Sequence, residues 1–218
     1  FLLLLPETPL HGAHELAERI CQHLAVHPFA PVYDAPLSVT VSIGVAAFPR
    51  NGNSWQTTLK AADLVASAPG LGDFVAVRAV TLAGQPSASL SEADILRVVD
   101  WARAEVGQGA VGAVVIQGTD TLEETSFLAD CVWDLAAPLV FTGAMRGPTQ
   151  VSADGPANLL AAARVAASPQ AQGAGALVVL DDTVHRATHV HKAHSTALSA
   201  FQSYGGQVLG HVIEGEAW

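Results

Sequence analysis

The chain carries few positive charges, and lysine is especially scarce. Its 218 residues include 10 lysines and arginines against 20 acidic residues, which gives a formal net charge of −10. Such a surface repels phosphate groups, so nucleic acid and anionic membranes are poor partners for it. The only lysines are Lys60 and Lys192. A lysine inside a motif of this chain is therefore hard to dismiss as ordinary solvated surface.

Cysteine and long apolar runs are also rare. Cys21 and Cys131 stand far apart in the sequence and have no metal-ligand spacing. Two cysteines make no disulfide framework for a chain of this size, which favours a reducing, cytoplasmic compartment. The apolar run at residues 1–5 ends at Pro6, too early for a membrane span or the core of a signal peptide. The chain opens without methionine and inside a strand-like run, so we expect it to be part of something longer.

Apolar residues are abundant, at 50% of the chain, and only 14% are charged. Together with the length of 218 residues, this composition predicts one or two folded domains with a hydrophobic core. A first block, residues 1–64, has strand patterns at 1–5 and 37–48 and helix patterns at 11–24 and 54–64. We expect this block to be a small α+β unit.

A second block, residues 65–218, alternates strand and helix patterns in the way typical of parallel βαβ units. The strand patterns cover residues 74–82, 111–116, 138–142 and 176–180. The helix patterns cover residues 90–105, 121–135 and 156–167. The sequence therefore predicts an α/β fold with an open, doubly wound parallel sheet.

A hydroxyl and a carboxylate stand side by side where one of these strand patterns ends. The run at 111–116 is followed by Gly118, Thr119 and Asp120, and a helix pattern then begins with Thr121 and Glu124 in capping-box spacing. The carboxyl ends of strands in open α/β sheets are the usual place for ligands. Thr and Asp are also favoured at helix N-caps, so these residues alone leave a purely structural role open.

Lys192 provides a candidate partner for this pair. A hydroxyl becomes an effective nucleophile or proton carrier only when a neighbouring base takes its proton, and an amine shielded from water can be that base. Thr119, Lys192 and Asp120 can form such a group, with the carboxylate orienting the amine.

Four runs of the second block resemble the asparaginase/glutaminase family of amidohydrolases. They are Gly-Thr-Asp-Thr-Leu-Glu-Glu-Thr at 118–125, Thr-Gly-Ala-Met-Arg at 142–146, Ser-Ala-Asp-Gly-Pro-Ala-Asn-Leu at 152–159 and Val-His-Lys-Ala-His-Ser-Thr at 190–196. The resemblance covers about residues 64–218 and implies the N-terminal domain of that family without its smaller C-terminal domain. Asp154 lies in a turn that leads into a helix, where we expect a structural role.

The resemblance also implies roles for individual residues. The positions matching Thr119, Lys192 and Asp120 act as a catalytic triad in the family. Asp120 would also bind the α-amino group of the substrate, Ser87 its α-carboxylate, and the backbone at Ala144 would lie near the scissile amide. The expected substrate-binding residues are therefore Ser87, Gly118, Thr119, Asp120 and Ala144. The expected ligand is L-asparagine or L-aspartate, without a cofactor, in a homo-oligomer whose sites a neighbour's C-terminal domain completes.

The first block resembles the C-terminal part of a GGDEF domain, the diguanylate cyclase fold. The matching runs are Leu-Leu-Leu-Pro-Glu-Thr at 3–8, Val-Ser-Ile-Gly-Val-Ala at 41–46 and Leu-Lys-Ala-Ala-Asp at 59–63. The signature turn that binds GTP phosphates and metal in that family is absent. We therefore expect a packing module here and no synthesis of a cyclic dinucleotide.

One departure from the asparaginase pattern affects the expected activity. The family places a second essential threonine in a glycine-rich strand and turn upstream of the stretch that matches near Leu64. No Gly-Thr-Gly-Gly-Thr run occurs in residues 1–218, and neither Thr8 nor Thr40 sits in such a turn. Ala88 stands where many members carry a polar substrate ligand. The sequence therefore predicts an impaired asparaginase-type hydrolase, and the alternative is a non-catalytic fusion module that binds L-aspartate or L-asparagine weakly.

Two further clusters favour ordinary explanations. Four histidines crowd into ten residues and raise the question of zinc: His185, His189, His191 and His194. No cysteine or acidic residue completes a ligand set among them, so we expect incidental histidines and no metal. Trp55, Trp101 and Trp133 fall in helix patterns and are expected to be packing residues.

Overall fold

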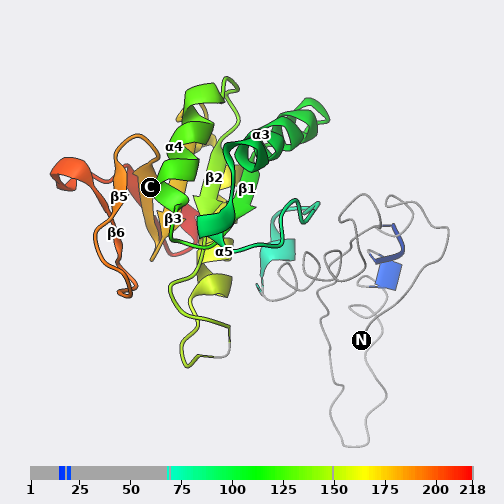
Figure 1. Ribbon diagram of the computed structural model, residues 1–218. Helices are drawn as coiled ribbons and strands as arrows, with labels where there is room; N and C mark the ends of the chain where they lie inside the picture. The colour runs from blue at the N-terminus through cyan, green and yellow to red at the C-terminus, as the bar shows by residue number, and fades with distance from the viewer. Residues whose placement is uncertain (1–14, 18, 21–67, 69, 149, 218) are drawn as a thin grey trace, which may run out of the picture. The chain divides into compact units, whose positions relative to one another are not determined.

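A computed structural model describes residues 15–17, 19–20, 68, 70–148 and 150–217 (Figure 1). The chain divides into two units, Phe1–Thr81 and Leu82–Trp218. In the first unit, residues 15–17 and 19–20 are helical, within the helix predicted at 11–24, and a short 3₁₀ helix, η1, spans Leu71–Asp73. The segments predicted at 1–5, 37–48 and 54–64 lie outside the described residues.

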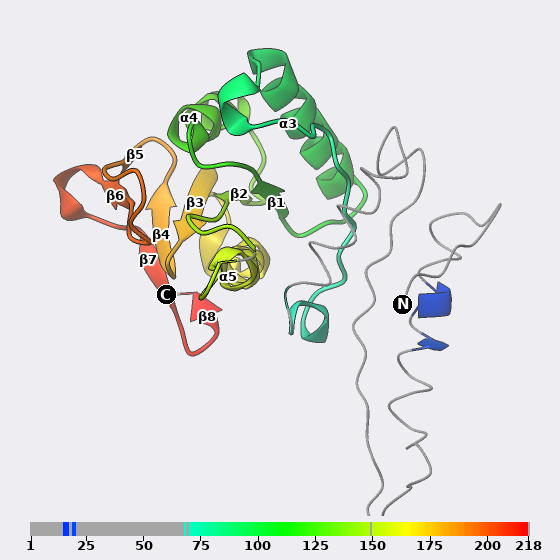
Figure 2. The ribbon, with the colours of Figure 1, turned by 60° about the horizontal axis from the view of Figure 1, so that its bottom comes forward.

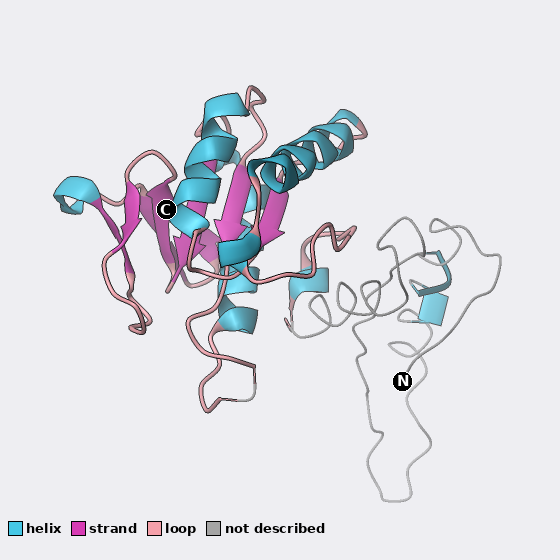
Figure 3. Ribbon diagram, viewed as in Figure 1, coloured by secondary structure: helices cyan, strands magenta, loops and turns pink. Residues whose placement is uncertain are grey.

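The second unit is built on a six-stranded sheet with the order β1-β2-β3-β4-β7-β8. Its strands are β1 (Ala113–Ile116), β2 (Leu139–Thr142), β3 (Ala176–Leu180), β4 (Thr183–Arg186), β7 (Gly210–Ile213) and β8 (Glu216–Ala217). The first three are parallel, and each of the last three runs antiparallel to its neighbour. Strands β5 (Val190–Lys192) and β6 (Phe201–Ser203) form a separate antiparallel pair (Figure 3).

Helices cover both faces of the parallel part of the sheet. Helices α3 (Glu92–Gly107) and α4 (Leu122–Val132) pack on one face, and α5 (Gly155–Ala167) packs on the other (Figure 2). Three short 3₁₀ helices complete the unit: η2 (Ser87–Ser89), η3 (Pro169–Ala171) and η4 (Tyr204–Gly206). The predicted α/β class and the doubly wound arrangement are thus confirmed.

Alternation along the strands separates two hydrophobic cores. Leu139 and Phe141 of β2 join the core under α3 and α4, whereas Val140 between them joins the core under α5. Successive side chains of a strand point to opposite faces, so a strand covered on both sides has to be apolar throughout. All four residues of β2 and all five of β3 are buried.

The structure differs from the predicted elements in two places. Residues 74–82 form no strand, although their pattern predicted one. Apolar alternation indicates a chain that fits a pleated surface, but this propensity depends on context and does not by itself make a strand. The short antiparallel strands after Leu180 were not predicted, because strands of two to four residues carry too little pattern.

Trp101 and Trp133 are packing residues, as predicted. Trp133 is buried, and its indole N–H donates to the carbonyl of Ala137 at 2.7 Å. Trp101 packs against the core under α3 and α4. Trp55 lies outside the described residues. In the part of the chain that the structure describes, no helix is long and apolar enough to cross a bilayer.

Candidate active site

The carboxyl ends of the three parallel strands meet at one edge of the sheet, and the loops that follow β1 and β2 touch there. A Cβ atom placed on Gly143 would lie 2.5 Å from the carbonyl oxygen of Gln117 and 3.1 Å from Cγ2 of Thr119. Only glycine permits so close an approach of two backbones. Thr119 is therefore fixed against Gly143 at the end of β2. Ala144 follows Gly143 on the loop after that strand.

Lys192 meets Thr119 and Asp120 at this edge. Its Nζ donates a hydrogen bond to Thr119 Oγ1 at 2.9 Å and lies 3.4 Å from Asp120 Oδ1. Thr119 is buried, the Lys192 side chain is 16% exposed and that of Asp120 is 70% exposed. The amine is thus largely shielded from water, while the carboxylate remains open to a ligand. The structure brings together the three residues that the sequence analysis grouped.

Ser87 joins the same cluster from η2. Its buried Oγ accepts a hydrogen bond from the backbone N–H of Asp120 at 3.2 Å, and its carbonyl accepts one from Thr121 Oγ1 at 2.9 Å. The predicted capping box of Thr121 and Glu124 is wrong, because the hydroxyl of Thr121 is engaged by Ser87 and makes no bond to the start of α4. A tertiary contact replaces the local one.

Gly118 permits the contact between Ser87 and the loop. A Cβ atom at Gly118 would lie 2.8 Å from Ser87 Oγ, too close for any other residue without movement of the serine. A serine hydroxyl that accepts one bond keeps its own proton to donate. The Ser87 hydroxyl therefore keeps a proton that it can donate, as the role that the family resemblance implies for this residue would require.

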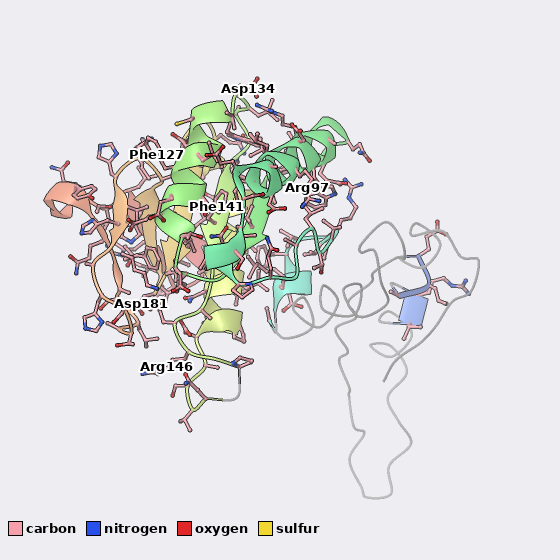
Figure 4. The ribbon with its side chains drawn as sticks, viewed as in Figure 1. Arg97, Phe127, Asp134, Phe141, Arg146 and Asp181 are labelled. Atoms are coloured by element: carbon pink, nitrogen blue, oxygen red, sulfur yellow. The ribbon has the colours of Figure 1, made fainter. Side chains whose placement is uncertain are left out.

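Asp154 holds the loop that carries Ala144. Its two carboxylate oxygens accept the backbone N–H groups of Met145 at 2.9 Å and Arg146 at 2.8 Å. Ala144, just before them, is exposed, and the loop extends beyond the sheet to the labelled Arg146 in Figure 4. The structural role predicted for Asp154 is confirmed.

Asn158, one turn further along α5, ties this loop to the end of β3. Its buried side-chain amide donates to the carbonyl of Gly143 and to Asp154, each at 3.0 Å. Its carbonyl oxygen accepts the N–H of Asp181 at 3.1 Å. Asn158 belongs to a quoted run of the sequence, but its contacts depend on elements far apart in the chain.

Glu123, in the first turn of α4, is a residue of this site that the sequence analysis did not single out. Its carboxylate accepts a hydrogen bond from the backbone N–H of Lys192. The signal in the sequence that could have placed Glu123 in the site was its position four residues after Thr119. An acidic residue in the first helical turn has an ordinary explanation in the helix dipole, which concealed the contact.

The histidine cluster lies around β4, β5 and β6. Buried His185 shares a hydrogen bond of 2.8 Å with Ser203 Oγ through Nδ1, and its Nε2 has no partner among the described residues. Burial, assisted by the nearby His211 and His191, lowers the pKa of His185 to about 4. His191 stacks on Tyr204 with ring centroids 4.3 Å apart. Within the described ranges, no three His, Cys, Asp or Glu side chains are placed to hold a metal ion.

Comparison with known families accounts for both blocks. The model of the asparaginase N-terminal domain matches residues 42–218, well over half of the chain. The chain belongs to the asparaginase family. The model of the diguanylate cyclase GGDEF domain matches residues 1–68, which confirms the second resemblance. The two matches overlap at residues 42–68, which include the boundary predicted between the two blocks after residue 64.

Individual asparaginases agree with this assignment. "Probable L-asparaginase 4" of Schizosaccharomyces pombe is 38% identical over 151 residues, which are 69% of this chain and 42% of the relative. "L-asparaginase 2" of Bacillus subtilis is 46% identical over 92 residues, 42% of this chain and 24% of that relative. The chain spans less than half the length of these relatives.

A solved structure supports the fold of this family member. The probable cytoplasmic L-asparaginase from Campylobacter jejuni superposes with a TM-score of 0.68 at 32% sequence identity. The superposition covers 72% of this chain and 50% of that one.

Proposed function

We propose that this chain carries the site of an asparaginase-type amidohydrolase, which hydrolyses L-asparagine to L-aspartate and ammonia. L-Glutamine is the alternative substrate, since nothing in the described site selects the shorter side chain. The observation that carries the proposal is the contact of Lys192 Nζ with Thr119 Oγ1 and its proximity to Asp120 Oδ1.

Thr119, Lys192 and Asp120 would move the proton that amide hydrolysis requires. In its neutral form the Lys192 amine takes the proton of the Thr119 hydroxyl, and Asp120 stabilises the resulting ammonium group. As the C–N bond of the amide breaks, that proton goes to the leaving nitrogen, which departs as ammonia. A water molecule adds its hydroxyl to the carbonyl carbon, and its other proton restores the Thr119 hydroxyl. The acid product then gives its proton to ammonia, so that the products are a carboxylate and ammonium.

The remaining groups suit an amino acid as the ligand. Asp120 offers an accessible carboxylate for an α-ammonium group, and Ser87 offers a hydroxyl proton for an α-carboxylate. The loop at Ala144, fixed by Asp154, lies next to Thr119, where the amide would sit. We expect the chain to form homo-oligomers, as implied by the family.

We further propose that turnover is impaired. The family's second threonine lies in a Gly-Thr-Gly-Gly-Thr run, and residues 1–218 contain no such run. Loss of one member of a catalytic group commonly lowers the rate about 10⁴-fold or more. The same observation favours a second function, in which the chain binds L-aspartate or L-asparagine without hydrolysing it.

Ammonia release from L-asparagine, measured with a coupled assay beside calorimetric titration of L-aspartate, tests both functions. We expect slow release that Lys192→Ala abolishes. Lys192→Arg serves as the matched variant, because arginine keeps the charge but cannot give up its proton in a protein. Loss of release in both variants, with L-aspartate still bound by Lys192→Arg, supports lysine as the base.

Binding of L-aspartate without any release would support the binding module. An unaltered rate in Lys192→Ala would contradict the triad, and absence of both release and binding would contradict both functions.

A further inference from the structure

Lys192 is the last residue of β5, and its backbone N–H makes no hydrogen bond to the neighbouring strand β6. In the β5–β6 pair, Tyr204 N–H donates to the His189 carbonyl and Ala193 N–H donates to the Ala200 carbonyl. Hydrogen-bonded and non-hydrogen-bonded positions alternate in an antiparallel pair. His191 therefore faces β6 through its backbone, whereas the N–H of Lys192 points away from β6.

Glu123 accepts this N–H from the first turn of α4. The bond joins a carboxylate to a backbone N–H, and charge assistance makes such bonds stronger than neutral ones. It also links the β5–β6 pair, which is separate from the main sheet, to the helix that follows Thr119 and Asp120 in the chain.

The segment 119–123 thus contacts Lys192 both at the end of its side chain and at its backbone. Thr119 Oγ1 lies 2.9 Å from Nζ, and Glu123 binds the backbone N–H of the same residue. A lysine side chain has four flexible carbons, so the contacts of Nζ with Thr119 and Asp120 do not by themselves fix the backbone of β5 relative to α4. The bond from the Lys192 backbone N–H to Glu123 fixes β5 against α4 and so limits where the amine can reach.

We propose that Glu123 is a positioning residue, which holds the backbone of Lys192 so that its amine stays on the Thr119 hydroxyl. This role rests on the proposed function only in that the Thr119–Lys192 contact is the reactive one. Glu124 is the natural comparison, because it is an exposed acidic residue in the same helical turn.

The test measures how fast the Lys192 amine reacts with acetic anhydride between pH 6 and pH 10. The chain has two lysines, so peptide mass spectrometry reads Lys192 alone and uses Lys60 as an internal reference. Glu123→Ala should raise the Lys192 rate about tenfold, the factor expected from loss of one charge-assisted hydrogen bond. Glu123→Gln should give a rate between those of the parent and Glu123→Ala, because the amide oxygen accepts the same bond without the charge.

Three further variants or readouts make the result decisive. Glu124→Ala should leave the rate unchanged, although it removes the same charge. Glu123→Asp, which keeps the charge but shortens the side chain, should resemble Glu123→Ala and replaces it if the alanine variant does not fold. Wherever ammonia release is measurable, Glu123→Ala should lower kcat with little change in KM.

An unchanged Lys192 rate in folded Glu123→Ala and Glu123→Asp would overturn the proposal, as would an equal effect of Glu124→Ala. Because the labelling requires no turnover, an inactive chain would fail the proposed function and still test this inference. A role in stability alone would lower the melting temperature of Glu123→Ala without changing the pH profile of Lys192 labelling.

Discussion

The hydroxyl of Ser87 accepts the backbone N–H of Asp120 at 3.2 Å, across 33 residues of sequence. This bond fixes the loop in which Thr119 and Asp120 stand against η2. The residue whose carboxylate pairs with Lys192 is therefore held at its backbone by a buried serine. The geometry of the proposed ligand site and the local stability of this loop therefore both depend on Ser87 Oγ.

Ser87→Ala should weaken binding of L-aspartate and destabilise the protein. The variant leaves the Asp120 N–H without its acceptor, at a cost of roughly 1–3 kcal/mol in the free energy of unfolding. It also removes the donor proposed for the ligand's carboxylate. Urea unfolding and calorimetric titration measure the two effects. Ser89→Ala, an exposed residue of the same 3₁₀ helix, is the control and should change neither. Equal behaviour of the two variants would contradict the prediction.

Gly143→Ala should destabilise the site edge through overpacking. Its new methyl group would lie 2.5 Å from the carbonyl oxygen of Gln117, and backbone atoms cannot move away cheaply. We expect a loss of about 1–3 kcal/mol in the free energy of unfolding. Gly147→Ala places its methyl group in open space and should change stability by less than about 0.5 kcal/mol. Urea unfolding compares the free energies of unfolding of the two variants. An unchanged value in Gly143→Ala would show that the loops after β1 and β2 can separate.

Asn158→Ala should loosen the loop that carries Ala144. Three hydrogen bonds disappear together, to Gly143, Asp154 and the Asp181 N–H, and the site is buried. Loss of buried partners should lower the free energy of unfolding by roughly 2–4 kcal/mol. Hydrogen exchange of the Met145 and Arg146 amides should accelerate, since Asp154 loses its own support. Unchanged exchange at these amides would show that Asp154 holds the loop unaided.

Acid should destabilise the protein through His185. Burial lowers the pKa of this histidine from 6.5 to about 4, so the unfolded chain takes up its proton more readily than the folded one. The stabilising contribution is therefore complete above pH 6.5 and is lost as the pH falls toward 4, by an amount on the order of 3 kcal/mol.

His185→Gln should flatten this part of the pH dependence in urea titrations between pH 4 and pH 7. The exposed His189→Gln variant is the control and should keep the full slope. An unaltered slope in His185→Gln would assign the acid sensitivity to other groups.

The sequence by itself determined the parallel part of the fold. Continuous apolar runs gave β2 and β3, and apolar residues at helical spacing gave α3, α4 and α5, because burial on one or both faces imposes a repeating pattern. The motif runs also placed Thr119, Asp120 and Lys192 in one candidate group, and the family matches confirmed the resemblance that they carry.

Only the tertiary structure decided which polar atoms meet. The Thr121 hydroxyl binds the Ser87 carbonyl in place of capping α4, and the Glu123 carboxylate binds the Lys192 backbone N–H. Residues 74–82, likewise, form no strand despite their pattern. A hydrogen bond satisfies a donor equally well from near or far in the sequence, so propensity cannot choose between the two partners. That choice follows from the packing of α4 and β5, which bring together residues some seventy positions apart.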